Sequence, residues 1–177
     1  MFEYLKTMIR GTLNLRKLVQ DGLTVGKNFH AQEGVIIDPG HCWLITIGNN
    51  VTLAPRVHIL AHDASTKIPL GYTQIGKVTI GDNVFVGANT IILPNVTIGD
   101  HVVIGAGSVV TKDLEARGVY CGNPCVKIYE YDKWIEKQRN LLGNSPKYNE
   151  EYMIQNITDE KKKKMQSDLN SRIGYII

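Results

Sequence analysis

A six-residue repeat over residues 80–115 constrains this chain more than any other feature. Each unit begins with a branched aliphatic residue, at Ile80, Val86, Ile92, Ile98, Ile104 and Val110. A strand has a period of two residues and a helix a period of 3.6, so neither explains this spacing. A repeat this short is typical of a solenoid in which each unit is one short strand followed by a corner. Three units would close one triangular turn with the aliphatic residues on its axis. We therefore expect an all-β fold, a parallel β-helix.

Glycine, asparagine and aspartate recur behind the aliphatic positions, as in Ile80-Gly81-Asp82-Asn83. These residues supply the left-handed or crowded backbone that corners require. The register continues backwards to Val25 and breaks twice, at residues 38–46 and at residues 64–75. Extra residues cannot enter a solenoid core, so each break must leave the coil as a loop. Loops of this kind commonly carry the specific function.

The repeat also divides the chain into three expected parts. Residues 1–22 are predicted to form a helical cap for the first coil, with membrane contact as the alternative. Residues 23–128 form the expected β-helix domain, including the loop at 64–75. Residues 129–177 are expected to be a helical extension.

Two helices are predicted near the C-terminal end. An amphipathic helix is expected over residues 128–142, ending at Gly143. A second helix is expected to be capped by Thr158 or Asp159 and to run into the lysines at residues 161–164. This lysine run is read as a solvated face, with an acidic or lipid partner as the alternative.

Composition and charge exclude several classes of function. The 177 residues carry a formal charge of +3 without a basic and aromatic pattern, which argues against nucleic-acid binding. No apolar run reaches the length of a membrane span, and the start of the chain lacks a secretory signal. The three cysteines have neither zinc nor disulfide-framework spacing, which suits reduced thiols. We expect a cytoplasmic protein.

His62 lies where the coil gives way to the second loop. Its place in the repeat is that of Asn83 and Asn89, a corner from which side chains project outward. An accessible imidazole there suits a general base, because imidazole titrates near neutrality. The alternative is a surface histidine without a role. None of the five histidines has metal-ligand spacing, so we expect no metal.

Asp63 follows His62 at a place that normally holds a small apolar residue. A carboxylate pointing into the core would be unfavourable, so either the register has already broken or the group is hydrogen-bonded. Asp63 then either orients the imidazole of His62 or caps the loop by accepting backbone N–H groups.

A stretch of small residues follows, at residues 104–113 and 122–127. Small side chains at successive corners would let a long, narrow ligand such as a pantetheine arm lie along the coils. Lys112 could meet a phosphate as a point charge. The alternative is that glycine and alanine only satisfy the corners.

These segments together resemble one enzyme family. The runs 46–57, 80–87 and 104–113, with Ala61-His62-Asp63 and Gly122-Asn123-Pro124, are similar to the hexapeptide-repeat sugar O-acetyltransferases of maltose, galactosides and capsular polysaccharides. The resemblance covers residues 25–128. It implies a left-handed coil, acetyl-CoA as co-substrate, and a homotrimer with active sites between subunits.

The resemblance also implies roles for single residues. His62 matches the base that removes a proton from the acceptor hydroxyl, with Asp63 beside it. Glu33 and Asp38 match the acceptor side. The coenzyme side is implied to comprise Gly87, Ala88, Ala106, Ser108, Thr111, Lys112 and Pro124.

The chain departs from the sugar acetyltransferases at several places. They carry asparagine where this sequence has Glu33, and some carry tryptophan in place of Phe85; they also differ at both ends of the chain. The expected acceptor is therefore a sugar of a surface polysaccharide or its precursor. The alternatives are N-acetylation of a nucleotide-linked amino sugar, serine O-acetylation, and a β-helix that binds without catalysis.

Overall fold

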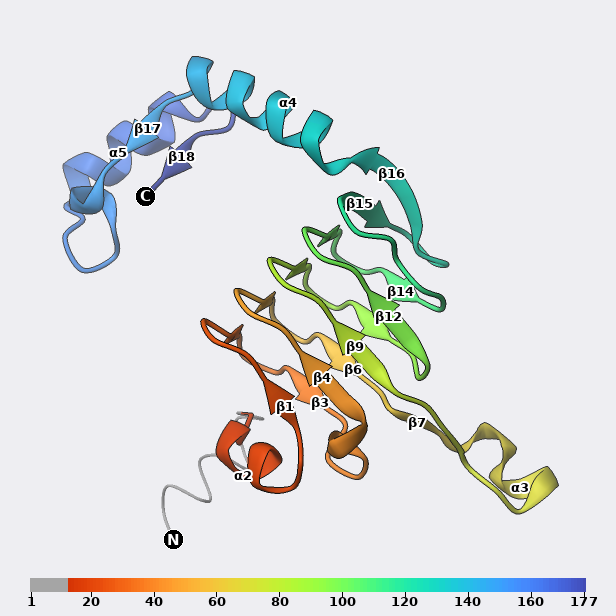
Figure 1. Ribbon diagram of the computed structural model, residues 1–177. Coiled ribbons are helices and arrows are strands. Elements are labelled where there is room, and N and C mark those ends of the chain that lie inside the picture. The colour runs from red at the N-terminus through yellow and green to blue at the C-terminus, as the bar shows by residue number, and fades with distance from the viewer. Residues whose placement is uncertain (1–12) are drawn as a thin grey trace, which may run out of the picture. The chain divides into compact units, whose positions relative to one another are not determined.

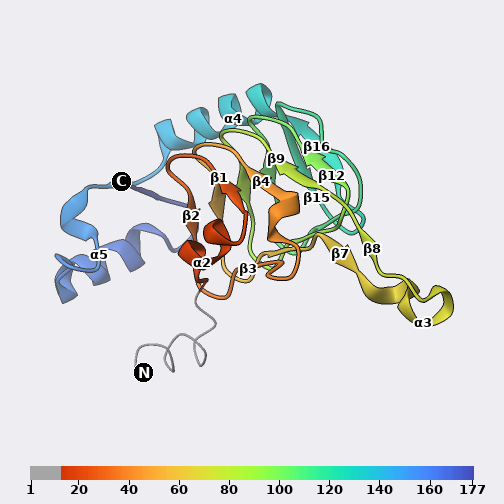
Figure 2. The ribbon, with the colours of Figure 1, turned by 60° about the horizontal axis from the view of Figure 1, so that its bottom comes forward.

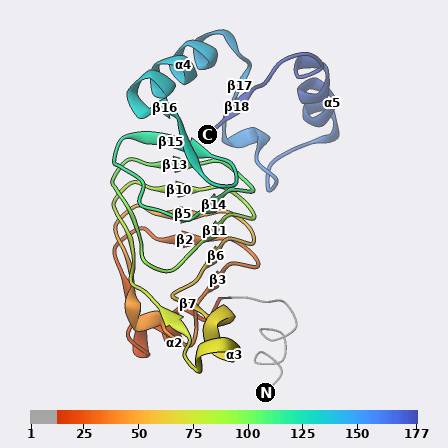
Figure 3. The same cartoon turned by 90° about the vertical axis from the view of Figure 1, so that its right-hand side faces the viewer.

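Three short sheets wrap around one axis and form the three sides of a coil, whose successive turns are stacked in Figure 1. The structure, a computed structural model, describes residues 13–177. In the four full turns of the coil, which end at β14, consecutive strands lie in different sheets, and each pairs with the strand of the next turn. Figure 3 shows β2, β5, β10 and β13 stacked in this way. The predicted parallel β-helix is confirmed.

Each strand of the coil is only two to five residues long. The first sheet comprises β1 (Thr24–Val25), β4 (Ile45–Ile47), β9 (Val78–Ile80) and β12 (Val96–Ile98). The second comprises β2 (His30–Ala31), β5 (Thr52–Leu53), β10 (Phe85–Val86), β13 (Val103–Ile104), β15 (Gly118–Cys121) and β16 (Val126–Glu130). The third comprises β3 (Ile36–Ile37), β6 (His58–Ile59), β11 (Ile91–Ile92) and β14 (Val109–Val110).

The six-residue period places the aliphatic positions on the axis. Ile80 pairs with Ile98 and Ile92 pairs with Val110, each pair eighteen residues apart, which is three units of the repeat. All four side chains are at most 1% exposed. Burying one such side chain contributes about 1.5–3 kcal/mol, so the stack of like residues stabilises the coil.

Corners use left-handed backbone where asparagine recurs. Asn28, Asn50 and Asn83 have φ values of 55–57° and follow one another along one corner. Asn28 Nδ2 donates to Asn50 Oδ1 at 2.9 Å, and Asn50 Nδ2 donates to Asn83 Oδ1 at 3.0 Å. Asparagine tolerates this conformation better than most residues that have a Cβ. It therefore turns the chain and links the coils by side-chain hydrogen bonds.

Two segments leave the coil where the repeat breaks. Between β3 and β4 the chain forms the 3-10 helix η1 (Cys42–Leu44). After β6 it continues as β7 (His62–Asp63), η2 (Ala64–Thr66) and α3 (Lys67–Leu70), and it returns as β8 (Gln74–Ile75). β7 and β8 pair antiparallel, and we call residues 62–75 the arm. Figure 2 shows the arm running out of the coil.

At the N-terminal end, α2 (Leu15–Gln20) packs on the first turn. Leu18 belongs to the hydrophobic core, and Cys42 Sγ donates to Leu18 O at 3.5 Å. Asn14 caps α2 by accepting the Lys17 N–H at 3.1 Å. The predicted helical cap spans residues 1–22, of which residues 1–12 lie outside the described residues.

The C-terminal end of the coil corrects one prediction. Residues 128–130 are not helical, because β16 turns back antiparallel on β15 and pairs Tyr129 with Val119. α4 (Tyr131–Asn144) begins only after this hairpin. A strand that covers the last turn satisfies backbone groups that would otherwise be an open edge.

The chain divides into two compact units, and the second comprises residues 132–177. It contains most of α4 and the elements β17 (Lys147–Tyr148), η3 (Glu150–Tyr152), α5 (Asp159–Asp168) and β18 (Tyr175–Ile176). Thr158 caps α5 by accepting the Lys161 N–H at 3.3 Å. Within residues 13–177, every helix is too short or too polar to cross a bilayer.

Candidate active site

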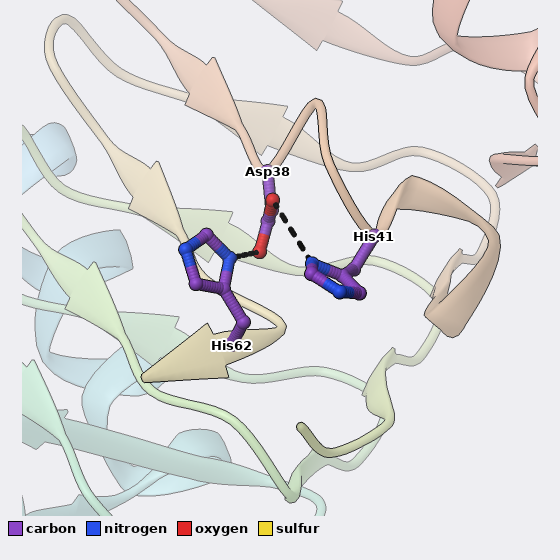
Figure 4. Close-up of side chains that lie close together, drawn as sticks. All are labelled: Asp38, His41 and His62. Atoms are coloured by element: carbon purple, nitrogen blue, oxygen red, sulfur yellow. Dashed lines mark hydrogen bonds and ion pairs between the residues drawn. The ribbon is translucent and has the colours of Figure 1, made fainter. Parts of the chain in front are cut away.

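Asp38 and His62 meet between the first and second turns of the coil (Figure 4). Asp38 follows β3, and His62 begins the arm after β6; β3 and β6 are neighbours in one sheet. Asp38 Oδ2 lies 2.5 Å from His62 Nδ1 and accepts the Ala61 N–H at 2.9 Å. Asp38 Oδ1 accepts the Gly40 N–H at 3.0 Å. The carboxylate is therefore held by two backbone groups and aimed at the imidazole.

The electrostatics of the pair fix the proton on one ring nitrogen. Burial by itself raises the pKa of the Asp38 carboxyl, but hydrogen bonds from His62, Ala61 and Gly40 outweigh it and lower that pKa below 3.8. An ionised carboxylate only accepts, so His62 Nδ1 carries the hydrogen between the two groups, and in the neutral imidazole the lone pair then lies on Nε2. The His62 side chain is 37% exposed, which leaves Nε2 a route to a ligand.

Asp63 takes the second of the two options that the sequence left open. Its Oδ1 accepts the Ser65 N–H at 2.8 Å and caps η2, and this bond holds the pKa of Asp63 below its ordinary value. The side chain is exposed because the register has already broken at β7. The expected partnership with His62 is wrong for Asp63, because Asp38 occupies that place.

Asp38 also corrects an expectation. The resemblance implied a place on the acceptor side, but the Asp38 side chain is fully buried and both of its oxygens accept hydrogen bonds. It cannot touch an acceptor in this arrangement. Its position instead fits the orientation of His62.

His41 is a third member of the cluster that spacing did not reveal. Its Nδ1 is sealed from solvent without a hydrogen bond and lies 3.9 Å from Asp38 Oδ1. The rings of His41 and His62 are 5.0 Å apart. Asp38, His41 and His62 each offer one ligand atom within 4.8 Å of the others, so a metal ion could be held here. The oxygens of Asp38 are already satisfied by protein donors, and we assign no metal to them.

One edge of the third sheet carries the predicted acceptor and pantetheine residues. Glu33, Ala88 and Ala106 each precede a strand of that sheet and are partly or fully exposed. The Gly107 N–H donates to Ala88 O at 2.8 Å, which stacks these corners. A shallow groove along this edge is lined by Glu33, Gly34, Pro55, Arg56 and Asn89.

The opposite edge of the same sheet carries His62 and the predicted phosphate contacts. Thr111 and Lys112 directly follow β14 and are exposed. Pro124 is exposed in the turn between β15 and β16. The structure thus places Ala88 and Ala106 at one edge of the third sheet and Thr111 and Lys112 at the other, with Pro124 in the last turn of the second sheet.

Ser108 and Gly87 are buried, contrary to their expected contact with a coenzyme. Ser108 is fully buried; its Oγ donates to Gly105 O at 2.6 Å and accepts the Gly122 N–H at 3.1 Å. A Cβ at Gly87 would overlap Ala106 N, so glycine is needed there for the close approach of two turns. Both residues support the corners that carry Ala88 and Ala106.

Two kinds of comparison with known proteins point to one family. The profile described as "Bacterial transferase hexapeptide (six repeats)" matches residues 77–112. Protein CapG of Staphylococcus aureus is 46% identical over 99 residues, covering 54% of this chain and 58% of that protein. Galactoside O-acetyltransferase of Escherichia coli K12 is 41% identical over 113 residues, covering 60% and 53%. The chain therefore spans somewhat more than half the length of these curated relatives.

Solved structures show the same architecture. A maltose O-acetyltransferase of Clostridium difficile 630 superposes with a TM-score of 0.55 and 33% identity, covering 72% of this chain and 83% of that one. A hexapeptide-repeat acetyltransferase of Vibrio cholerae, 22% identical with a TM-score of 0.54, shares the fold. These neighbours imply that the coil is left-handed.

Proposed function

Because the chain belongs to the hexapeptide-repeat acyltransferases, we propose that it transfers an acetyl group from acetyl-CoA to a sugar hydroxyl, with His62 as the general base. The observation that carries the proposal is the bond between Asp38 and His62, which leaves Nε2 free at an exposed position. The names of the galactoside and maltose relatives support an O-acetyl transfer to sugar.

His62 acts twice in the proposed reaction. Its Nε2 takes the proton of the acceptor hydroxyl while the oxygen bonds to the thioester carbonyl carbon. The imidazolium then gives that proton to the sulfur as the carbon–sulfur bond breaks. The acetyl ester and free CoA are the products, and no acyl-enzyme is needed. A positioned base of this kind contributes about 10²–10⁴ in rate.

Asp38 stabilises the charged stage of this cycle. When His62 carries the second proton, its positive charge lies beside a carboxylate 2.5 Å away. The same hydrogen bond fixes the ring orientation and the tautomer, so that the free lone pair faces outward. Asp38 is thus a positioning residue rather than a group that touches the acceptor.

The residues expected to hold acetyl-CoA fit a long, narrow ligand. Ala88 and Ala106 offer small side chains on successive turns, and Lys112 offers an exposed ammonium for a phosphate. Acetyl-CoA supplies the activated acetyl group. The backbone at Ala88 and Ala106 would position its pantetheine arm, and Thr111 and Lys112 would hold its nucleotide end.

The geometry favours a site completed by a second copy of the chain. His62 and the corner formed by Ala88 and Ala106, the alanine corner, lie on opposite edges of one sheet. About six residues of extended chain separate the two edges, which corresponds to roughly 15–20 Å. A neighbouring copy could bring its alanine corner to the first copy's His62. We propose a homotrimer with three such sites.

The acceptor is proposed to be a sugar of a surface polysaccharide or its precursor. Exposed Glu33 and Arg56 line the groove at the edge of the sheet that carries Ala88 and Ala106. The sugar acetyltransferases carry a neutral asparagine in place of Glu33. A charged groove favours an acceptor other than free maltose or a simple galactoside.

The test is CoA thiol release from acetyl-CoA with a panel of glycans, for the wild type, His62→Ala and His101→Asn. His101 is the matched control, since it occupies a left-handed corner (φ 55°) that suits asparagine. We expect His62→Ala to lose about 10²–10⁴ of the rate and His101→Asn to keep it. Equal turnover by His62→Ala and the wild type would remove His62 from the mechanism. A product that survives mild base would be an amide and would overturn the hydroxyl acceptor.

A further inference from the structure

An exposed tryptophan lies near the proposed base and is linked to it through the ring of His41. Trp43 lies in η1, the segment that leaves the coil between the first two turns, and it is 57% exposed. Its backbone side is tightly packed: a Cβ added to Gly22 would lie 2.8 Å from Trp43 Cβ. The residue is therefore held at its base while a large part of its surface faces solvent.

A series of ring contacts links Trp43 to the base. The rings of Trp43 and His41 are 5.4 Å apart at 48°, and those of His41 and His62 are 5.0 Å apart at 44°. The two spacings together place the indole within about 10 Å of the His62 imidazole. The His41 ring contacts both of the other rings, and this contact helps to orient the tryptophan side chain before any ligand arrives.

We propose that Trp43 is the platform on which the acceptor's sugar ring lies during acetyl transfer. A pyranose has an apolar C–H face and a rim of hydroxyls. With that face on the indole, a rim hydroxyl can reach Nε2 of His62. The inference rests on the proposed function and deepens it, because it defines the acceptor as a cyclic sugar and excludes small acyclic alcohols.

Physical chemistry favours this use of the residue. A rigid, amphipathic ring gives a large contact area for little loss of conformational freedom on binding. A side chain that is already oriented binds with a smaller entropic cost than one that must be ordered. An apolar platform beside the base also supplies orientation, which can lower the barrier as much as the base itself.

The binding test does not depend on turnover. The chain holds two tryptophans, so Trp134→Phe leaves Trp43 as the single indole reporter. In this background, methyl glycopyranosides of galactose, glucose and N-acetylglucosamine are titrated against indole fluorescence, with serine and glycerol as acyclic probes. We expect at least one glycoside to change the emission saturably and the acyclic probes to leave it unchanged. A saturable response to serine or glycerol alone would overturn the proposal.

The kinetic test uses Trp43→Ala, Trp43→Phe and the exposed aromatic control Tyr129→Ala on β16. With the best acceptor from the glycan panel, Trp43→Ala should raise the acceptor KM tenfold or more and leave the KM for acetyl-CoA unchanged. Trp43→Phe should recover much of the loss, and Tyr129→Ala should match the wild type. An unchanged acceptor KM in Trp43→Ala would overturn the platform while leaving the acetyl transfer intact.

The same variant tests a competing use of the surface. If Trp43 lay between copies of the chain, Trp43→Ala would lower the oligomer mass measured by light scattering. That result would overturn the platform. An unchanged mass with a raised acceptor KM supports it. Glycoside binding that persists in a protein without transferase activity would refute the proposed function and leave the binding site standing.

Discussion

Asp38 and His62 are 24 residues apart in the chain and 2.5 Å apart in space. One turn of the coil separates them, and the pairing of β3 with β6 brings the two turns into contact. A short hydrogen bond between a buried carboxylate and a partly exposed imidazole on different turns depends on the register of the coil. The proposed base is therefore oriented by the fold rather than by its neighbours in sequence.

Replacing Asp38 by asparagine should separate the effect of its charge on kcat from the effect of its shape. Asp38→Asn keeps the volume but removes the negative charge that stabilises protonated His62. We expect kcat for acetyl transfer to fall by about 10²–10⁴ with little change in the KM for acetyl-CoA. Asp63→Asn, which alters an exposed cap of the arm, should keep kcat within about threefold of the wild type. A larger fall in kcat for Asp63→Asn than for Asp38→Asn would indicate that Asp63, and not Asp38, orients His62.

Asp38 should also make stability depend on pH. Its pKa in the folded protein is below the ordinary value of 3.8. A carboxyl with a lowered pKa stabilises the fold at pH values above 3.8 and loses this contribution as the pH falls through the folded pKa. Urea unfolding between pH 2.5 and 6 should show a steeper acid loss in the wild type than in Asp38→Asn. Parallel curves for the two proteins would contradict this origin.

Ser108 should matter for stability rather than for coenzyme binding. Ser108→Ala removes the hydroxyl that accepts the Gly122 N–H and donates to Gly105 O. A buried group left without its partner costs about 1–3 kcal/mol, which denaturant unfolding can measure. Ser167→Ala, on the exposed side of α5, is the control and should leave stability unchanged. If Ser108→Ala raised the KM for acetyl-CoA without changing stability, Ser108 would be a coenzyme-binding residue after all.

Adjacent isoleucines of β3 provide a test of the coil itself. Ile37 is 2% exposed and points to the axis, whereas Ile36 is 44% exposed. Ile37→Ala should lower the free energy of unfolding by about 2–5 kcal/mol. Ile36→Ala should lower it by about 1 kcal/mol or less, because that side chain is already partly in water. Similar losses at both positions would be inconsistent with a solid triangular core.

The coil could be predicted because its cause is local. A branched residue every sixth position determines the axis, and asparagine supplies the left-handed corners. The fifth place of each unit is also a buried position, which argues against the expected coenzyme contact of Ser108. Thr90 and Ser108 share that place with buried valines, and both are fully buried.

The site could be predicted only in part, because its members come from different turns. His62 stands where the repeat breaks, and that break is visible in the sequence. Asp38, His41 and Trp43 fall in the first break, where the residues indicate a turn and nothing more. Which of them faces His62 depends on how the extra residues of η1 are accommodated, and spacing does not encode this. Residues 128–130 differ from their predicted helix for a similar reason. Their apolar pattern suits a helix, but the pairing with β15, which the pattern does not encode, makes them a strand.

The residues proposed for the acceptor and those proposed for acetyl-CoA belong to different turns of the coil. Asp38, Trp43 and His62 belong to its first two turns, while Ala88, Ala106 and Lys112 belong to the next two. Each turn bonds only to the one below and the one above it. If the proposed function holds, sequence change in the first two turns can therefore alter the acceptor while the next two turns keep the same donor.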